Sequence, residues 1–312
     1  MCCCDDFNIR IPRSESIDQF KHNFVGRVNM IQNNNDGEST YTLGINEFSH
    51  LSEDVLRATK TGYIPDPDSP DTNETQPADS ERNSRGTAPP NFNWSDYYGV
   101  VRAVQDQKSC GSCWAFAAIG ALEGQMGIFK KEFDKLSEQE VIECARSVDN
   151  TLRGCGGGWS SLVYKHSEVN KGITTSMYKP YLATTNNKVC NVRNLRAPSS
   201  IVKGWVFGPG RDEVGIKNML YTSGPLYVTY YVAGDFYYYS GGVYQDNGKL
   251  CRGQGSNHAV LLVGYGTDAN GVDYWICKNS WGPNWGEKGF FRIRRGVGLC
   301  NFGSEATYPK LA

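Results

Sequence analysis

The chain has 312 residues, more than the roughly 100–200 residues of one ordinary domain, so it can hold more than one structural unit. Its composition, 39% hydrophobic and 21% charged, is that of a globular protein, and a formal net charge of -1 gives no reason to expect nucleic acid or an acidic lipid surface as a partner. No apolar run reaches the length of a membrane span. The first fifteen residues lack the apolar stretch of a secretory signal, so we interpret the start of the chain as cut or misassigned.

Residues 1–61 are expected to form a small, partly helical module. Apolar residues recur at spacings of three and four, which places them on one face of a helix that ends near Asn35. These residues are Ile17, Phe20, Phe24, Val28 and Ile31. Residues 62–88 are rich in proline, aspartate and small polar residues with almost nothing to bury, which predicts an extended, exposed linker.

Residues 89–312 change in character along their length. The stretch 114–130 is strongly apolar, as in a buried helix, and Ser137 begins a second helix with a capping-box pattern. After residue 200, β-branched and aromatic runs alternate with glycine-rich turns. The predicted strands are 201–207, 226–232, 259–265, 274–278 and 290–294. We therefore expect an α+β body with a helical lobe over about 95–199, a β lobe over about 200–305, and a cleft between them.

The chain contains eleven cysteines, and this odd number leaves at least one thiol unpaired if the others form disulfides. Cys113 would open the apolar helix, where free N–H groups and the positive end of the helix dipole favour the nucleophilic thiolate. A pair of structural cysteines, Cys110 and Cys113, is an equal alternative for this C-x-x-C taken alone. The flanking residues decide between the two, because Cys-Gly-Ser-Cys-Trp is the sequence around the nucleophile of papain and the cathepsins.

On these residues the body, 89–312, resembles the mature part of a papain-family cysteine peptidase of the cathepsin L-like branch. Two further motifs match: SNHAV supplies His258, 145 residues after Cys113, and KNSWG supplies Asn279. The resemblance implies a two-lobe fold, helical lobe plus β-barrel-like lobe, and a cysteine endopeptidase. In it Cys113 attacks the peptide carbonyl, His258 holds the thiolate and protonates the leaving amine, and Asn279 orients the imidazole.

Other matched residues are expected to bind the oxyanion and the peptide. Gln107 matches the family's oxyanion donor, although Lys108 replaces the glycine that usually follows it. The residues implied for substrate binding are Gly157, Gly158, Trp159, Thr229, Ala259, Trp281 and Glu305. Glu305 is expected at the floor of the pocket for P2, the residue two positions before the cut, where a carboxylate would accept Arg as well as bulky apolar side chains.

The resemblance extends, with fewer matches, to an inhibitory propeptide. The run 44–48, GINEF, is close to a propeptide motif of the cathepsin L-like branch. Residues 1–61 are therefore interpreted as a partial propeptide and 62–88 as a linker and activation segment, cut near 87–90. The propeptide would dock on the β lobe with the linker in the cleft. Acid pH is expected to loosen its carboxylate-bearing contacts.

For the cysteines the resemblance implies the disulfides Cys110–Cys155, Cys144–Cys190 and Cys251–Cys300, with Cys277 a buried free thiol. Cys2, Cys3 and Cys4 precede any recognised module, and Asn73 and Asn93 lie in glycosylation sequons. We expect no cofactor or metal, polypeptide substrates, inhibition by the chain's own propeptide and by cystatin-like proteins, a monomer, and a lysosomal or secreted location.

Two alternatives belong to other classes of protein. A catalytically silent binding protein on the same fold is disfavoured because no catalytic position is substituted. A dithiol redox or zinc protein using Cys110 and Cys113 lacks a second Cys/His set at metal spacing. The four histidines include no pair like the one with which cathepsin B-like carboxydipeptidases hold a substrate C-terminus, so endopeptidase action is expected.

Overall fold

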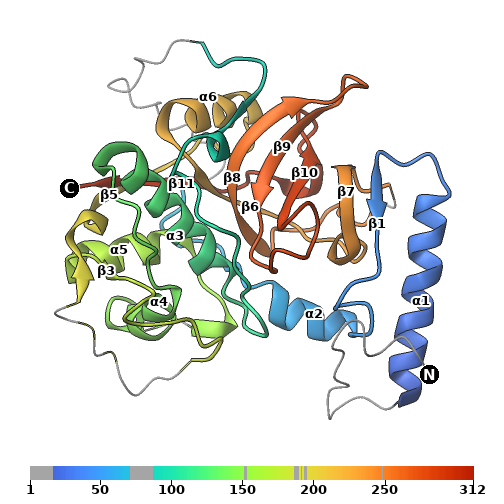
Figure 1. Cartoon of the computed structure of the whole chain (residues 1–312), viewed down its shortest axis with the longest axis horizontal. Coiled ribbons are helices and arrows are strands. Elements are labelled where there is room, and N and C mark those ends of the chain that lie inside the picture. The colour runs from blue at the N-terminus through green and yellow to red at the C-terminus, as the bar shows by residue number, and fades with distance from the viewer. Residues whose placement is uncertain are drawn as a thin grey trace.

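The computed structural model describes residues 17–70, 87–150, 153–185, 190, 192, 195–247 and 249–312. These residues form two packed lobes, with an N-terminal segment lying against one of them (Figure 1). Within these ranges no helix is both long and apolar enough to cross a membrane. The expectations for Cys2, Cys3, Cys4 and Asn73 fall outside the described residues.

The helical lobe is built around α3 (Cys113–Gln125), which is buried on nearly all sides. Its alanines and glycines let neighbouring elements approach closely, and α4 (Glu138–Cys144) and α5 (Ser160–Asn170) pack against it. The predicted helix 114–130 is confirmed as far as Gln125, after which Met126–Lys130 form a π-helical turn. Ser137 caps α4 as predicted, because its hydroxyl accepts the backbone N–H of Glu140.

The β lobe is a nine-stranded sheet in the order β1-β7-β10-β9-β8-β6-β11-β5, with β2 beside β8. The strands are β1 (Tyr41–Leu43), β2 (Phe92–Asn93), β5 (Val202–Phe207), β6 (Leu226–Tyr230), β7 (Tyr239–Tyr244), β8 (His258–Thr267), β9 (Asp273–Lys278), β10 (Phe290–Arg294) and β11 (Ala306–Leu311). A separate pair is formed by β3 (Ile173–Thr174) and β4 (Arg196–Ala197). The five predicted strands are confirmed as β5, β6, β8, β9 and β10, and the α+β class is confirmed with them. The helix α6 (Glu213–Ser223), also in this half, was not predicted.

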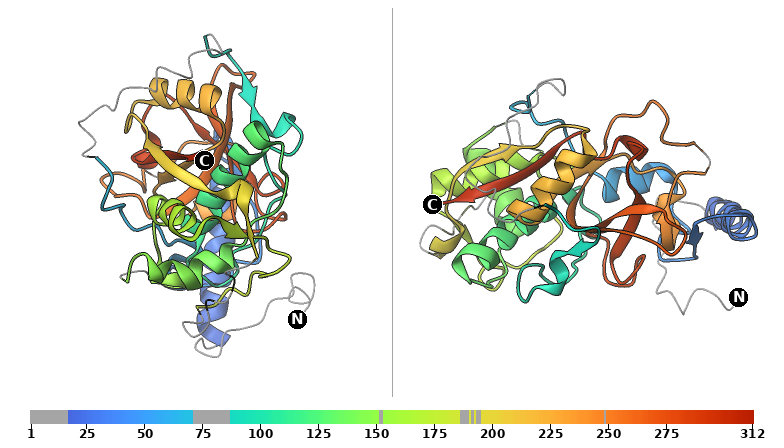
Figure 2. Two further views of the ribbon diagram at one scale, coloured as in Figure 1. Left: turned by 90° about the vertical axis from the view of Figure 1, so that its left-hand side faces the viewer. Right: turned by 90° about the horizontal axis from the view of Figure 1, so that it is seen from above.

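The N-terminal segment joins the β lobe through a strand of its own. The predicted helix is confirmed as α1 (Ile17–Asn35), which packs on β1, and β1 pairs antiparallel with β7 at the edge of the sheet. Figure 2 shows α1 at the end of the molecule opposite the C-terminus. The helix α2 (Glu53–Lys60) then carries the chain to the junction of the lobes, and its Leu56 is buried in the same core as the β lobe.

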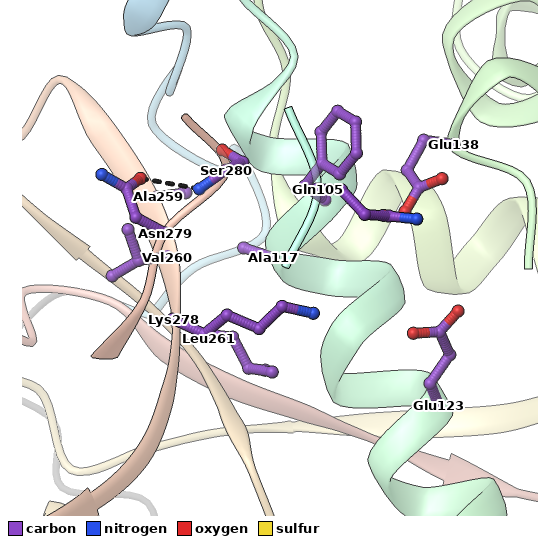
Figure 3. A pocket seen from close by; sticks show the side chains of 11 residues that line it. Gln105, Ala117, Glu123, Glu138, Ala259, Val260, Leu261, Lys278, Asn279 and Ser280 are labelled. Carbon is purple, nitrogen blue, oxygen red and sulfur yellow. Dashed lines mark hydrogen bonds between the residues drawn. The ribbon is translucent and has the colours of Figure 1, made fainter. Parts of the chain in front are cut away.

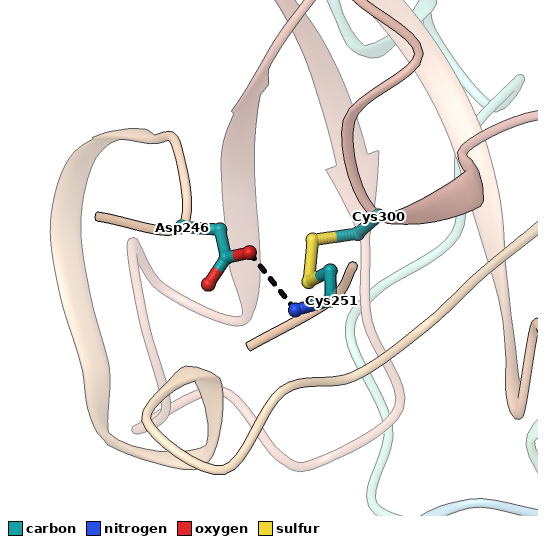
Figure 4. A group of neighbouring side chains, drawn as sticks. All are labelled: Asp246, Cys251 and Cys300. Atoms are coloured by element: carbon teal, nitrogen blue, oxygen red, sulfur yellow. Dashed lines mark hydrogen bonds between the residues drawn. A yellow bond between two sulfur atoms is a disulfide. The ribbon is translucent and has the colours of Figure 1, made fainter. Parts of the chain in front are cut away.

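Three disulfides stabilise the loops, and they join the pairs that the family resemblance implies: Cys110–Cys155, Cys144–Cys190 and Cys251–Cys300. Cys277 is buried as a free thiol. Asp246 lies beside Cys251–Cys300, but its two carboxylate oxygens accept the backbone N–H groups of Leu250 and Cys251 (Figure 4). Because both sulfurs are also bonded to each other, this group closes a turn and has no donor set for a metal ion.

Candidate active site

The two lobes meet where the start of α3 faces the start of β8. Cys113 is the first residue of α3 and His258 the first residue of β8, and both are fully buried. The thiol of Cys113 is approached by the backbone N–H of Ala259, the residue after His258. Figure 3 shows α3 and the strand bearing Ala259 and Leu261 packed side by side. The sequence motifs therefore meet because each one begins a rigid element at the same junction.

His258 is held by Asn279 through its far ring nitrogen. Nε2 of His258 donates to Oδ1 of Asn279 at 2.9 Å, and because an amide oxygen can only accept, the proton belongs on Nε2. Nδ1 has no hydrogen-bond partner among the described residues. The ring of Trp281 covers the imidazole, with centroids 5.0 Å apart. Burial lowers the pKa of His258 to about 4, and the hydrogen bond to Asn279 opposes only part of this effect.

The amide of Gln107 is fixed on both sides. Its Oε1 accepts the hydroxyl of Ser280 at 2.6 Å, and its Nε2 donates to the carbonyls of Cys110 at 2.9 Å and Thr59 at 3.2 Å. Lys108, where the family has glycine, adopts a left-handed conformation with φ 55°. The turn therefore has the left-handed backbone that glycine adopts without strain, and Lys108 adopts it at some cost in strain.

A segment from the N-terminal part of the chain lies across this junction. The N–H groups of Gly62 and Tyr63 both donate to the carbonyl of Asn257, next to His258, at 3.1 Å. Ile64 and Gly62 form reciprocal backbone hydrogen bonds with Gly158, each 3.0 Å long, and this pairing is parallel. A Cβ on Gly62 would lie 2.1 Å from the carbonyl oxygen of Gly111, so only glycine passes here. The predicted peptide-binding wall at 157–158 is thus occupied by the chain's own residues.

The side chain of Tyr63 reaches Glu305, the residue predicted at the floor of the P2 pocket. Its phenol donates to Oε2 of Glu305 at 3.0 Å, and the hydroxyl of Ser160 donates to Oε1 at 2.9 Å. Thr229 supports the pocket because its N–H and Oγ1 bond the backbone of Glu305, and Ala259 lies opposite Thr229 across β6–β8. Burial, and next the charge of Asp66, raises the pKa of Glu305 to about 8.

Of the other predicted substrate-binding residues, Trp159 follows directly after Gly158 and is buried. Trp281 lies apart from the pocket, over His258, and its indole N–H donates to the carbonyl of Lys60 at 3.0 Å. The predicted residues therefore fall into two groups: one that includes Gly158 and Glu305 contacts the docked segment at 62–64, and Trp281 lies over His258.

The buried carboxyls of this contact surface act against release in acid. Burial raises the pKa of Asp66 and Glu305, and a carboxyl whose pKa is higher in the docked state binds a proton on docking. Acid therefore stabilises these contacts, contrary to the expectation that carboxylates loosen them. The groups whose shifts weaken docking in acid are His258 and Lys60, because burial lowers their pKa values.

Behind the site, a cavity of about 10 Å³ separates α3 from β8 and β9, about the room of one water molecule. Figure 3 shows the Lys278 ammonium directed toward α3, which contributes Glu123, while Glu138 lies at the start of α4. Burial lowers the pKa of Lys278 to about 8. Lys135 bridges the two carboxylates, at 3.0 Å from Glu123 and in closer contact with Glu138, so the interface between the lobes is charged as well as apolar.

Sequence reasoning missed several residues of the site, above all Tyr63, Asp66 and the serines at the start of α5. Each is an unremarkable residue in a linker or at a helix start, and no motif marks it. Ser280 is different. It stands inside the KNSWG motif beside Asn279, so its hydrogen bond to Gln107 could have been sought from the sequence.

With this geometry in place, comparisons identify the class of protein. Residues 88–310 match the papain family cysteine protease family. The chain is 36% identical over 285 residues to fruit bromelain of Ananas comosus, covering 89% of this chain and 76% of bromelain. It is 33% identical over 287 residues to cathepsin L of Sarcophaga peregrina, covering 88% of this chain and 79% of that protein. The solved structure of digestive procathepsin L2 proteinase from Tenebrio molitor larval midgut matches with a TM-score of 0.84 and 31% identity, over 99% of this chain and 97% of that one.

The chain therefore belongs to the papain family of cysteine proteases. It has the papain-like fold and is a cysteine-type endopeptidase. Its structural neighbours include proenzymes, and the N-terminal segment lies bound to the protease body in this chain too.

Proposed function

We propose that the chain is a latent endopeptidase in which Cys113 is the nucleophile and His258 its acid–base partner. The supporting observation is the buried Cys113 at the start of α3, next to an imidazole whose far nitrogen is fixed by Asn279. Residues 1–61 act as propeptide, 62–88 as linker and activation segment, and 89–312 as the protease body.

In the proposed reaction the Cys113 thiolate adds to the substrate's carbonyl carbon, and the oxyanion accepts hydrogen bonds from Nε2 of Gln107 and the N–H of Cys113. The C–N bond breaks as His258 transfers its Nδ1 proton to the leaving amine, which leaves a thioester on Cys113. Water then adds to the thioester and gives a proton to His258, and the C–S bond breaks to release the acid and the thiolate. Asn279 keeps the imidazole in one orientation throughout.

Latency follows from the same burial. In the docked state burial raises the pKa of Cys113 to about 12 and lowers that of His258 to about 4. Both directions favour a neutral thiol and a neutral imidazole over the thiolate–imidazolium pair in the docked state. Removal of Gly62 and Tyr63 readmits water and allows the ion pair to form, so the segment blocks both access and ionisation.

At P2 we propose that the enzyme accepts Arg and bulky side chains. The proposal is supported by the bond from the Tyr63 phenol to Glu305, because it shows that a large side chain with a polar end can reach this carboxyl. Once the pocket is open to water, the pKa of Glu305 falls, and the carboxylate can pair with a guanidinium.

We further propose a lysosomal or secreted location, where three disulfides persist, and a monomer that cystatin-like proteins inhibit. Its substrates are polypeptides, and no cofactor takes part in the reaction.

The test compares processed wild-type enzyme with Cys113→Ala and His258→Ala on internally quenched peptides. Both variants are expected to lose activity by about a thousandfold or more. Glu132→Ala, at an exposed position of the protease body, is the control and should keep full activity. A folded wild-type enzyme without peptidase activity would favour the alternative, a silent papain-fold binding protein.

A further inference from the structure

The propeptide places a carboxylate on the N-terminus of α5. Oδ2 of Asp66 accepts the backbone N–H of Ser161 at 3.1 Å, and Oδ1 accepts the hydroxyl of Ser161 at 2.9 Å. Both residues are buried, with exposed fractions of 5% for Asp66 and 2% for Ser161. Trp159, at the N-cap position of this 11-residue helix, makes no side-chain capping bond. A carboxylate from another segment therefore satisfies the first turn of α5.

Removal of the propeptide takes the Asp66 carboxylate away from the N-terminus of α5. The inference rests on the proposed function, since it concerns the enzyme after residues 1–88 have left. Ser161 then loses the acceptor for both its N–H and its hydroxyl, and the positive end of the α5 dipole faces the cleft. An anion is the ligand that such a group binds best, and the occupant in the precursor is an aspartate side chain.

The position of Asp66 relates this place to the substrate. The N–H of Tyr63 donates to the carbonyl of Asn257, next to His258, its phenol reaches Glu305, and Asp66 follows three residues later. Seen from the nucleophile, Ser161 therefore lies beyond the P2 pocket. Substrate residues on that side precede P2 in the chain.

We propose that Ser161 and the N-terminus of α5 form a subsite of the processed enzyme that selects Asp or Glu at position P3 or P4 of the substrate. The two neighbouring serines have different partners. Ser160 donates to Glu305 in the P2 pocket, and Ser161 donates to the carboxylate of the substrate's Asp or Glu, as it does to Asp66 in the precursor. The two subsites are adjacent. The charge of an acidic substrate residue therefore also raises the pKa of Glu305, as the charge of Asp66 does in the precursor.

The experiment uses processed enzyme and internally quenched peptides with Phe fixed at P2. Each of P3 and P4 carries Asp or its amide Asn, and Glu or Gln, so each pair differs in charge alone. At one of the positions the acid is expected to raise kcat/KM by about tenfold over the amide, chiefly through KM. Ser161→Thr keeps the hydroxyl and should keep the preference, whereas Ser161→Ala should reduce it to about twofold, the share left to the backbone N–H and dipole.

A third variant tests the inference even if Ser161→Ala changes the preference for acid over amide peptides only slightly. Ser161→Asp fills the place with a carboxylate of its own and should reverse the preference toward the amide peptides. Equal cleavage of the Asn and Gln peptides by all the variants shows that each is folded. An undiminished acid preference in Ser161→Asp, or equal rates for acid and amide at both positions in wild type, overturns the subsite. Failure of wild type to cleave any peptide overturns the proposed function instead.

Discussion

The phenol of Tyr63 donates to the carboxyl of Glu305 at 3.0 Å, although the two residues stand at opposite ends of the chain. On either side of Tyr63, Gly62 and Ile64 form backbone hydrogen bonds with Gly158. The N-terminal segment therefore contacts both the predicted wall at 157–158 and the predicted pocket residue Glu305. A segment that contacts both predicted elements of the peptide-binding cleft supports the proposed latency.

Tyr63→Phe in the precursor is expected to weaken docking. The change removes a hydrogen bond to a buried carboxyl while keeping the ring in the pocket, which corresponds to about 1–1.5 kcal/mol and about a tenfold larger open fraction. The rate at which a small alkylating reagent labels Cys113 in the unprocessed chain measures that fraction. Tyr98→Phe, at a tyrosine that is 89% exposed, is the control and should leave the rate unchanged. A rate as low as wild type in Tyr63→Phe would show that the bond contributes nothing to latency.

Glu305→Ala in the processed enzyme is expected to change selectivity at P2. Loss of the carboxylate removes the partner for Arg and leaves the apolar walls, so the ratio of Arg to Phe cleavage should fall by about tenfold or more. Paired kcat/KM values for peptides that differ only at P2 give this ratio. An unchanged ratio would mean that Glu305 does not determine specificity.

Docking should depend on pH through groups with opposing effects, and His258 and Glu305 represent the two signs. The pKa of His258 is lowered to about 4 in the docked state, so its contribution to docking is present above its ordinary pKa of about 6.5 and is lost as the pH falls toward 4. The pKa of Glu305 is raised to about 8, so its contribution is present in acid and is lost as the pH rises toward 8. Between about pH 4.5 and 6.5 the two slopes oppose each other.

Single substitutions should separate the contributions of His258 and Glu305 to the pH dependence of docking. Relative to wild type, a Glu305→Gln precursor should lose protection of the amides of Tyr63 and Ile64 as the pH falls from 6.5 to 4.5, by up to about tenfold per pH unit, whereas a His258→Ala precursor should gain it. Hydrogen exchange corrected for its intrinsic pH dependence measures both, because each amide donates a hydrogen bond across the docked interface. Protection that rises in Glu305→Gln, or that falls in His258→Ala, as the pH is lowered would contradict the assignment.

How far the sequence predicts this structure depends on which physical signal each element carries. The start of α3 and the motifs of Cys113, His258 and Asn279 are local patterns, so they were found by reading along the chain. The helix α6 was missed because Val214, Ile216 and other β-favouring residues interrupt its helical pattern.

Two other features required the assembled fold. The strand β11 was missed because Pro309 argues against a strand, but it lies beyond the residues that pair with β6, where its missing N–H is not needed. The bond from Tyr63 to Glu305 spans 242 residues of sequence, and no composition or spacing predicts such a contact.

Stability of the helical lobe should depend strongly on Glu140. This fully buried carboxylate accepts Nε of Arg196 at 2.9 Å, bonds His166 at 3.0 Å, and accepts the N–H of Thr174 at 2.6 Å. Burial alone would raise its pKa, but the bond from His166 and the charge of Arg196 hold the pKa below its ordinary value.

Glu140→Ala leaves the Arg196 guanidinium buried without its counter-charge, so the free energy of unfolding should fall by about 3–5 kcal/mol. Urea unfolding measures the loss, and Glu132→Ala, at an exposed position, should stay within about 0.5 kcal/mol of wild type. A loss below about 1 kcal/mol in Glu140→Ala would show that the cluster is not a structural centre of the lobe.

Alkylation of Cys113 by a peptidyl epoxide, followed by mass spectrometry on the same chain before and after processing, tests the central claim most directly. Cys277 serves as an internal control, since it is a free thiol with no exposed surface. We predict that processing raises the labelling rate of Cys113 by about a hundredfold or more, that His258→Ala abolishes this gain, and that Cys277 stays unlabelled. Equal rates before and after processing, or full labelling in His258→Ala, would contradict the claim that the docked segment holds the thiol protonated and that His258 activates it.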